Sequence, residues 1–197
     1  MKGEERQFMR PITIGILALQ GAYEAHARTI QSLEATPKLV RLPADLEGIH
    51  GLIMPGGEST TMLKFLERHN FFDTLKTFVQ TTPTFGTCAG AILLAKAVEN
   101  PAQKSLAALD ITVERNAYGR QIDSTILTAP TKLEGGPLEM VFIRAPRITR
   151  TGPEVETLAT REGSPVLVHH GHLLAATFHP ELSTDLRVHR FFLNLIR

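Results

Sequence analysis

The stretch PTFGTCAGAILLAKAV, residues 83–98, places a cysteine between a predicted strand and a predicted helix. Pro83–Thr87 is short and apolar, as in a buried strand, and a helix is expected from Ala89 to about Val98. Between them lies Gly-x-Cys-x-Gly, the cysteine version of a nucleophile elbow, whose tight turn requires small residues beside the nucleophile. The stretch therefore predicts an α/β strand–turn–helix unit with Cys88 at its turn.

The same alternation of strand and helix extends outward through the first half of the chain. Strands are predicted at Ile12–Leu19, Lys38–Leu42 and Gly51–Met54, and helices at Ala22–Ala35, Thr60–His69 and Phe71–Gln80, with Ser59 or Thr60 as an N-cap. The second half predicts short strands at Ile111–Glu114, Ser124–Thr128, Met140–Arg144, Glu154–Thr160, Pro165–Val168 and Leu173–Thr177, then a helix at Thr184–Ile196. We expect one three-layer α/β domain with a mixed, mainly parallel sheet.

Composition excludes several classes of protein. Hydrophobic residues make up 43% of the 197 residues and charged residues 21%, which predicts a packed core. A formal net charge of +1 gives no reason to expect nucleic acid as a partner. No apolar run approaches the roughly 20 residues that span a bilayer. A single cysteine and a first segment balanced by Glu4 and Glu5 favour the cytoplasm over secretion, with residues 1–11 as an extension and 12–197 as the domain.

Cys88 is a candidate nucleophile because of its position as well as its chemistry. A thiol at a helix N-terminus is shifted toward the reactive thiolate by the free N–H groups and the helix dipole. The backbone N–H of Ala89 follows the nucleophile directly and is a natural donor to an oxyanion. An isolated free cysteine is commonly a small buried hydrophobe, and only the flanking Gly86 and Gly90 favour catalysis over that interpretation.

His179 is the candidate base and Glu181 its orienting partner. His-Pro-Glu follows the predicted strand Leu173–Thr177, and function in parallel α/β sheets gathers at the carboxyl ends of strands. In an extended segment, residues two apart face the same way, so Glu181 is expected beside the imidazole of His179. Together with Cys88 they predict a nucleophile–base–acid triad.

The remaining histidines are given structural interpretations. Four of them lie in helical or loop contexts without a glycine-framed turn, and we expect surface or half-buried side chains: His26, His50, His69 and His189. Three more cluster at a predicted strand and its turn: His169, His170 and His172. Because paired metal-ligand spacing is missing from the sequence, no metal site is predicted.

These motifs resemble those of the class I, or triad, glutamine amidotransferases, and more closely those of the glutaminase subunits of pyridoxal 5′-phosphate synthase, the PdxT family. Cys88, His179 and Glu181 stand in motifs shared by the whole superfamily. The more specific segments are Leu17–Gly21, Pro55–Met62, Phe85–Gly90, Arg115–Gln121 with Asp123 and Ser124, Phe142–Pro146 and Thr177–Glu181. The resemblance extends from about Ile12 to the C-terminus and implies a flavodoxin-like fold.

The resemblance also implies residue roles. Gly56 and Gly57 would admit the substrate close to the backbone, with the Gly57 N–H as second oxyanion donor and Glu58 at the α-amino group of glutamine. The rest of the glutamine pocket would come from Ser59, Arg115, Ile143 (through its backbone) and Arg144. An arginine suits a carboxylate because its planar fork binds both oxygens.

The activity implied is hydrolysis of L-glutamine through a Cys88 thioester, with no cofactor. Ammonia would pass to a PdxS-type synthase subunit, a β/α barrel, within a large hetero-oligomer that makes pyridoxal 5′-phosphate from ribose 5-phosphate and glyceraldehyde 3-phosphate. Two alternatives stay open. One is the glutaminase subunit of another amidotransferase, such as that of histidine biosynthesis. The other is a cysteine-elbow redox or stress-binding protein without glutaminase activity.

Overall fold

A computed structural model describes residues 12–115, 117 and 124–196, and of His69 only the backbone. The predicted extension at residues 1–11 and most of the Arg115–Gln121 segment lie outside the described residues. Within the described part of the chain, no helix combines the length and the apolar character needed to cross a membrane.

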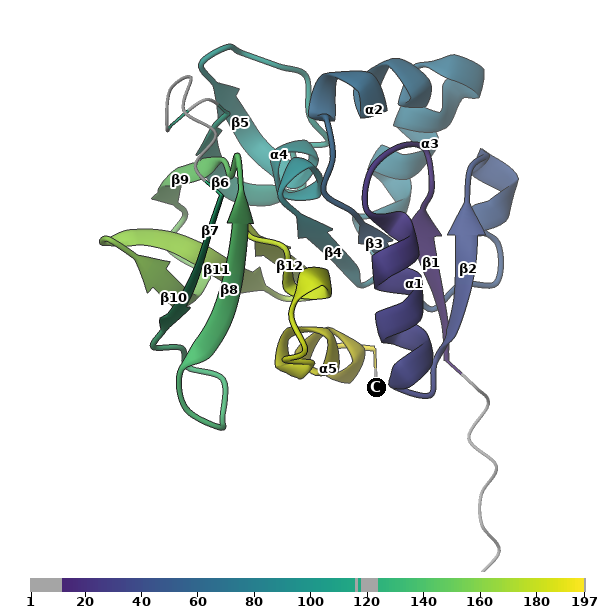
Figure 1. The fold of residues 1–197 in the computed structure, drawn as a ribbon. Helices are drawn as coiled ribbons and strands as arrows, with labels where there is room; N and C mark the ends of the chain where they lie inside the picture. Colours follow the sequence, from purple (N-terminus) through teal and green to yellow (C-terminus); the bar gives the residue numbers. More distant parts are fainter. Residues whose placement is uncertain (1–11, 116, 118–123, 197) are drawn as a thin grey trace, which may run out of the picture.

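A seven-stranded sheet forms the centre of the molecule (Figure 1). Its order is β10 (Glu156–Arg161), β11 (Ser164–His170), β12 (Leu173–Ala176), β4 (Thr84–Thr87), β3 (Gly51–Met54), β1 (Thr13–Leu17) and β2 (Thr36–Val40). The strands from β12 to β2 run parallel, and β10 and β11 add an antiparallel edge. The predicted mixed, mainly parallel sheet is therefore confirmed.

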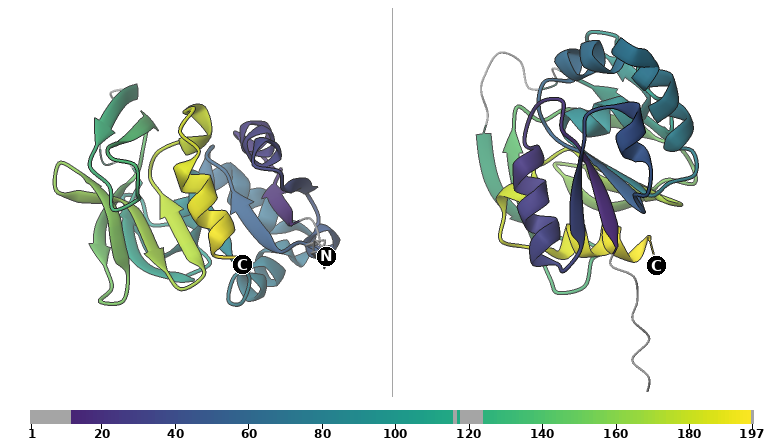
Figure 2. Two further views of the ribbon diagram at one scale, coloured as in Figure 1. Left: turned by 90° about the horizontal axis from the view of Figure 1, so that it is seen from below. Right: turned by 90° about the vertical axis from the view of Figure 1, so that its right-hand side faces the viewer.

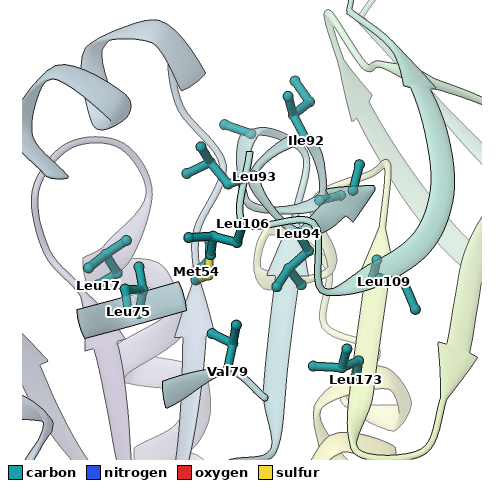
Figure 3. Packing of buried hydrophobic residues seen from close by; sticks show 14 of the residues in the cluster. Leu17, Met54, Leu75, Val79, Ile92, Leu93, Leu94, Leu106, Leu109 and Leu173 are labelled. Atoms are coloured by element: carbon teal, nitrogen blue, oxygen red, sulfur yellow. The ribbon is translucent and has the colours of Figure 1, made fainter. Parts of the chain in front are cut away.

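Helices cover both faces of this sheet, as Figure 2 shows from two directions. One face carries α1 (Tyr23–Ser32) and α5 (Arg187–Asn194), and the other carries α2 (Ser59–Leu66), α3 (Phe71–Phe78) and α4 (Ala89–Leu94). Successive strand residues alternate between two cores. In β3, Ile53 packs toward α1 and α5, whereas Leu52 and Met54 pack into the opposite core, part of which Figure 3 shows.

Two small sheets extend the carboxyl half of the molecule. The first contains β5 (Ala95–Glu99), β6 (Leu109–Glu114) and β9 (Arg147–Thr151), and the second pairs β7 (Ser124–Ala129) with β8 (Leu138–Ile143). Short 3-10 helices lie at Pro43–Leu46, Arg68–Asn70 and Pro180–Leu182. β9 was not predicted from the sequence because it lies at a sheet edge and, with Ile148 as its single buried residue, has no apolar run.

Three local predictions are corrected by the structure. The helix after Cys88 ends at Leu94 rather than about Val98, because Ala95 turns extended (φ −58°, ψ 145°) and starts β5, which pairs with β6. The N-cap of α2 is Glu58 rather than Ser59 or Thr60, since its side chain accepts hydrogen bonds from two backbone N–H groups of the first turn. The last predicted helix is shorter, and α5 begins only at Arg187.

Candidate active site

Three neighbouring strands of the central sheet bring the predicted motifs together. β3, β4 and β12 lie side by side, with Met54 opposite Gly86 and Thr87 opposite Ala176. Gly56, Cys88 and His179 each follow the carboxyl end of one of these strands. The sheet thus brings the three strand ends together at one edge, where ligands of parallel α/β sheets bind.

The turn at Cys88 has the strained backbone expected of a nucleophile elbow. Cys88 adopts a left-handed φ of 47°, and its N–H donates to the Ala176 carbonyl at 2.8 Å. A Cβ on Gly86 would lie 2.6 Å from the Gly90 carbonyl carbon, and one on Gly90 would lie 2.0 Å from the Met54 oxygen. Both glycines are therefore required by backbone packing, which is the steric reason predicted from the motif.

His179 and Glu181 form a buried pair beside this turn. Nδ1 of His179 lies 2.8 Å from Oε1 of Glu181, so Nε2 is the ring nitrogen left for the thiol. The His179 N–H donates to the Val141 carbonyl at 2.8 Å, which fixes the backbone of the base. Burial disfavours the charged ring, but Cys88 and the Glu181 carboxylate outweigh burial and raise the pKa of His179 to about 10.

The prediction that His179 and Glu181 lie in an extended segment was wrong. Pro180–Leu182 is a 3-10 helix, not an extended segment, and Leu182 N–H donates back to the His179 carbonyl. Glu181 reaches the imidazole because this tight turn folds it back. The proximity was predicted, but the backbone that produces it was not.

A cavity of about 270 Å³ opens over the thiol. Its lining combines the triad's Cys88 and His179 with Gln20, Gly57, Glu58, Ser59, Ile92, Arg115, Ile143 and Arg144. All the side chains or backbones that the sequence resemblance assigned to glutamine therefore border one cavity, apart from Gly56. Gly56 lies directly behind it, because a Cβ there would come within 2.3 Å of His179 Cε1.

Two charged side chains of the cavity, Glu58 and Arg115, are held by hydrogen bonds. Both carboxylate oxygens of Glu58 accept hydrogen bonds from Thr60 and Thr61, which keep the pKa of this carboxyl low although burial opposes that. Nη2 of Arg115 donates to Thr60 Oγ1 at 2.8 Å and lies 3.6 Å from Glu58 Oε1. Arg144 has a left-handed φ of 43° at the end of β8. The cavity thus offers both a carboxylate and guanidinium groups to an amino-acid ligand.

Gln20 is a cavity residue to which sequence reasoning gave no role. Its Oε1 accepts a hydrogen bond from the Glu58 N–H at 2.7 Å and lies close behind Gly57. Ala89 begins α4 after β4 and Gly57 follows β3, so the two predicted oxyanion donors come after neighbouring strands. The position of Gln20 just beyond β1, next to β3, was the available signal.

The expectation of surface or half-buried side chains was wrong for His26 and His189. Both are fully buried, because α1 and α5 pack on the same face of the sheet. His26 Nε2 lies 3.3 Å from Oε2 of Glu181, and its Nδ1 lies 3.0 Å from His189 Nε2. Neither helix alone carries a signal for this contact, which joins residues far apart in the sequence.

The three clustered histidines lie in a strand and its turn. His169 and His170 end β11 and His172 follows in its turn, as predicted. Among the described residues no group of three metal-binding side chains gathers. A larger cavity, of about 600 Å³, lies between Leu46 and Phe78 and has neither thiol nor imidazole in its lining.

Comparison with known proteins connects this site to a family. The sequence profile described as the SNO glutamine amidotransferase family matches residues 16–197. A protein from Koribacter versatilis named "Pyridoxal 5′-phosphate synthase subunit PdxT" is 59% identical, over 93% of this chain and 95% of its own. One of the same name from Solibacter usitatus is 51% identical over 92% and 97%. A crystal structure titled glutamine amidotransferase superposes with a TM-score of 0.85 at 45% identity, covering 93% of this chain and 98% of that one.

Proposed function

Since the chain belongs to the SNO glutamine amidotransferase family, we propose that it is the glutaminase subunit of a pyridoxal 5′-phosphate synthase. The observation that carries this proposal is the triad, in which Cys88 stands beside a His179 whose Nδ1 lies 2.8 Å from Glu181 Oε1. The substrate is L-glutamine and the products are L-glutamate and ammonia. No cofactor is needed for this acyl transfer.

The reaction begins with attack of the Cys88 thiolate on the side-chain amide carbon of glutamine. The N–H groups of Gly57 and Ala89 stabilise the oxyanion of the tetrahedral intermediate. The His179 imidazolium, held by Glu181, gives its proton to the departing nitrogen, so ammonia leaves and a thioester remains. His179 is then neutral, takes a proton from water, and the resulting hydroxide displaces the thiolate to release glutamate.

The charged residues of the cavity account for recognition of an amino acid at the far end of the substrate. Glu58 carries the negative charge that an α-ammonium group requires, and Arg115 or Arg144 carries the fork that suits an α-carboxylate. Ser59 shapes the wall through its backbone, because its hydroxyl donates to Gln103 Oε1 at 3.0 Å. Ile143 contributes its backbone at the end of β8.

Ammonia released here must reach a second chain. We assign that role to a PdxS-type β/α-barrel synthase in the cytoplasm, assembled with this chain as a large hetero-oligomer. The PdxT names of the curated relatives support this partner over a histidine-biosynthesis synthase. The His179–Glu181 pair and a cavity lined by Arg115 and Arg144 favour a glutaminase over a redox or stress-binding module, which needs none of these side chains.

Glutamine hydrolysis, measured with and without a barrel synthase, tests the proposal. We expect weak activity alone, activation by the barrel, and pyridoxal 5′-phosphate formation from glutamine in the complex. Cys88→Ala should abolish hydrolysis while the complex still makes pyridoxal 5′-phosphate from added ammonium salt. Hydrolysis retained by Cys88→Ala would refute the assignment of the nucleophile, and failure of any barrel synthase to activate the chain would refute the partner.

A further inference from the structure

The proposed triad uses only one oxygen of the Glu181 carboxylate. Oε1 faces His179 Nδ1, whereas Oε2 is buried and points to the other side of the side chain. His26 Nε2 lies 3.3 Å from Oε2 but is not aligned with it as a hydrogen bond, and this oxygen has no hydrogen-bond partner among the described residues. A buried carboxylate oxygen without a donor makes the charged form costly. His26 is therefore placed to supply this oxygen with a donor.

We propose that His26 is a positioning residue: its Nε2 lies close enough to Oε2 of Glu181 to donate a hydrogen bond after a small rotation of either side chain, and this contact keeps the carboxylate turned toward His179. The inference rests on the proposed function, because it concerns the same hydrolytic reaction. It adds a member to the machinery that touches neither the substrate nor the thiol.

The contacts of His26 decide which of its ring nitrogens carries the proton. A lone pair on Nε2 would face a carboxylate oxygen at 3.3 Å and repel it, so the proton belongs on Nε2. In this structure Nε2 hydrogen-bonds to Thr87 Oγ1 at 3.1 Å, and Oε2 of Glu181 lies beside this bond. Nδ1 is then an acceptor, and His189 Nε2 donates to it at 3.0 Å. His189 thereby selects the tautomer of His26 that Glu181 requires.

Both of these histidines are neutral near pH 7. Burial, followed by the charges of His189 and His179, lowers the pKa of His26, and burial lowers the pKa of His189 to about 4. Neutrality suits the positioning role, since a second imidazolium would compete with His179 for the negative charge of Glu181. A neutral imidazole gives Glu181 a hydrogen bond and leaves its charge to His179.

A matched pair of substitutions separates hydrogen bonding from packing. His26→Met fills a similar volume without a donor, whereas His26→Gln keeps an N–H at a similar reach. His172→Met makes the same replacement at a histidine whose ring lies 3.0 Å from the Val79 carbonyl and which precedes β12, at the end of that strand away from the triad, and serves as control. The kcat and KM of glutamine hydrolysis are measured for each variant in complex with a barrel synthase, together with the melting temperature.

Loss of the donor should lower kcat and leave KM nearly unchanged. Removing an outer partner that orients a metal-bound side chain costs about 10- to 100-fold, and we expect His26→Met to lose about tenfold or more in kcat with KM within about threefold. The loss falls on kcat because His26 contacts the partner of the catalytic base and not the substrate. His26→Gln should stay within about threefold of the unsubstituted protein in both kcat and KM.

Two results would overturn the inference: an unchanged kcat in His26→Met, or equal losses of kcat in His26→Met and His26→Gln, which would mean packing alone. Should His26→Met not fold, His189→Met replaces it. That variant frees the His26 tautomer, so a smaller loss of kcat is expected, and no loss would overturn the inference. A lack of hydrolysis by the unsubstituted complex would instead refute the proposed function.

Discussion

Gly56→Ala tests whether catalysis requires a residue without a side chain behind the triad. A Cβ at this position would lie 2.3 Å from Cε1 and 2.9 Å from Nδ1 of His179, and 3.3 Å from Cβ of Cys88. The shortest of these contacts must lengthen by about 1.1 Å to reach 3.4 Å, where ordinary van der Waals contact begins. A misplacement of about 1 Å at a catalytic group is enough to cost about 100-fold in rate.

Neither side of this contact has room to retreat. The His179 ring is held by Glu181 at 2.8 Å and its backbone by Val141 at 2.8 Å, while the Gly56 carbonyl accepts a hydrogen bond from Ala22 N–H at 3.0 Å. We therefore expect kcat for glutamine hydrolysis to fall about 100-fold, with a smaller change in KM because the charged wall of the cavity is untouched. Overpacking should also lower the free energy of unfolding by about 1–3 kcal/mol.

Gly51→Ala is the matched control for this experiment. Gly51 begins β3, at the end of the strand away from the site, and its Cβ would meet Ile196 Cδ1 at 2.7 Å and Phe192 Cζ at 3.1 Å. It should lose comparable stability and keep its kcat. The reasoning fails if Gly56→Ala hydrolyses glutamine within about threefold of the unsubstituted rate at a melting temperature similar to that of Gly51→Ala.

Three further predictions concern charge. Ring NMR titration should give His179 a pKa near 10, and Cys88→Ala should move it toward the ordinary value of about 6.5, since the thiol is one cause of the rise; an unmoved value would contradict that cause. Glu181→Gln, assayed for glutamine hydrolysis, should lower kcat on the order of 10² to 10⁴ by disturbing the imidazole tautomer, and near-normal turnover would argue against the triad. Hydrogen bonds from Arg187 hold the pKa of Asp185 below its usual value. The ionised carboxylate therefore stabilises the fold at pH above that usual value, and this stabilisation is lost as pH falls through the folded pKa. Asp185→Asn should weaken the acid dependence of the free energy of unfolding measured in urea, and an unchanged dependence would refute this.

The parts of the site that follow from the sequence are those encoded by short segments. Gly86 and Gly90 reveal the nucleophile elbow because the steric constraint on them lies within one turn. A Cβ at either position would clash with backbone atoms. The fold class likewise follows from apolar runs alternating with helical spacing. The identity of the substrate required whole segments matched to a family, because no local rule assigns Glu58 or Arg115 to glutamine.

What could not be predicted depends on contacts between distant elements. The burial of His26 and His189 arises only when α1 and α5 share a face of the sheet, and nothing within either helix announces that. The early end of α4 arises because β6, formed later in the chain, offers Ala95–Glu99 a pairing partner. The family resemblance assigned Glu58 to the substrate, and the structure shows that its side chain also caps α2.

Because β3, β4 and β12 are adjacent, the backbone pairing of these strands sets the distances between the groups of the catalytic centre. The nucleophile and the base each stand a few residues beyond paired strands, so their separation reflects one inter-strand step, about 4.8 Å, plus two short turns. Insertions in the outer sheets can reshape the mouth of the cavity without altering this interval. To change it, a substitution must break main-chain hydrogen bonds in the most buried strands of the protein. We therefore expect the paired central strands to tolerate few substitutions and the segments around the mouth of the cavity to tolerate many.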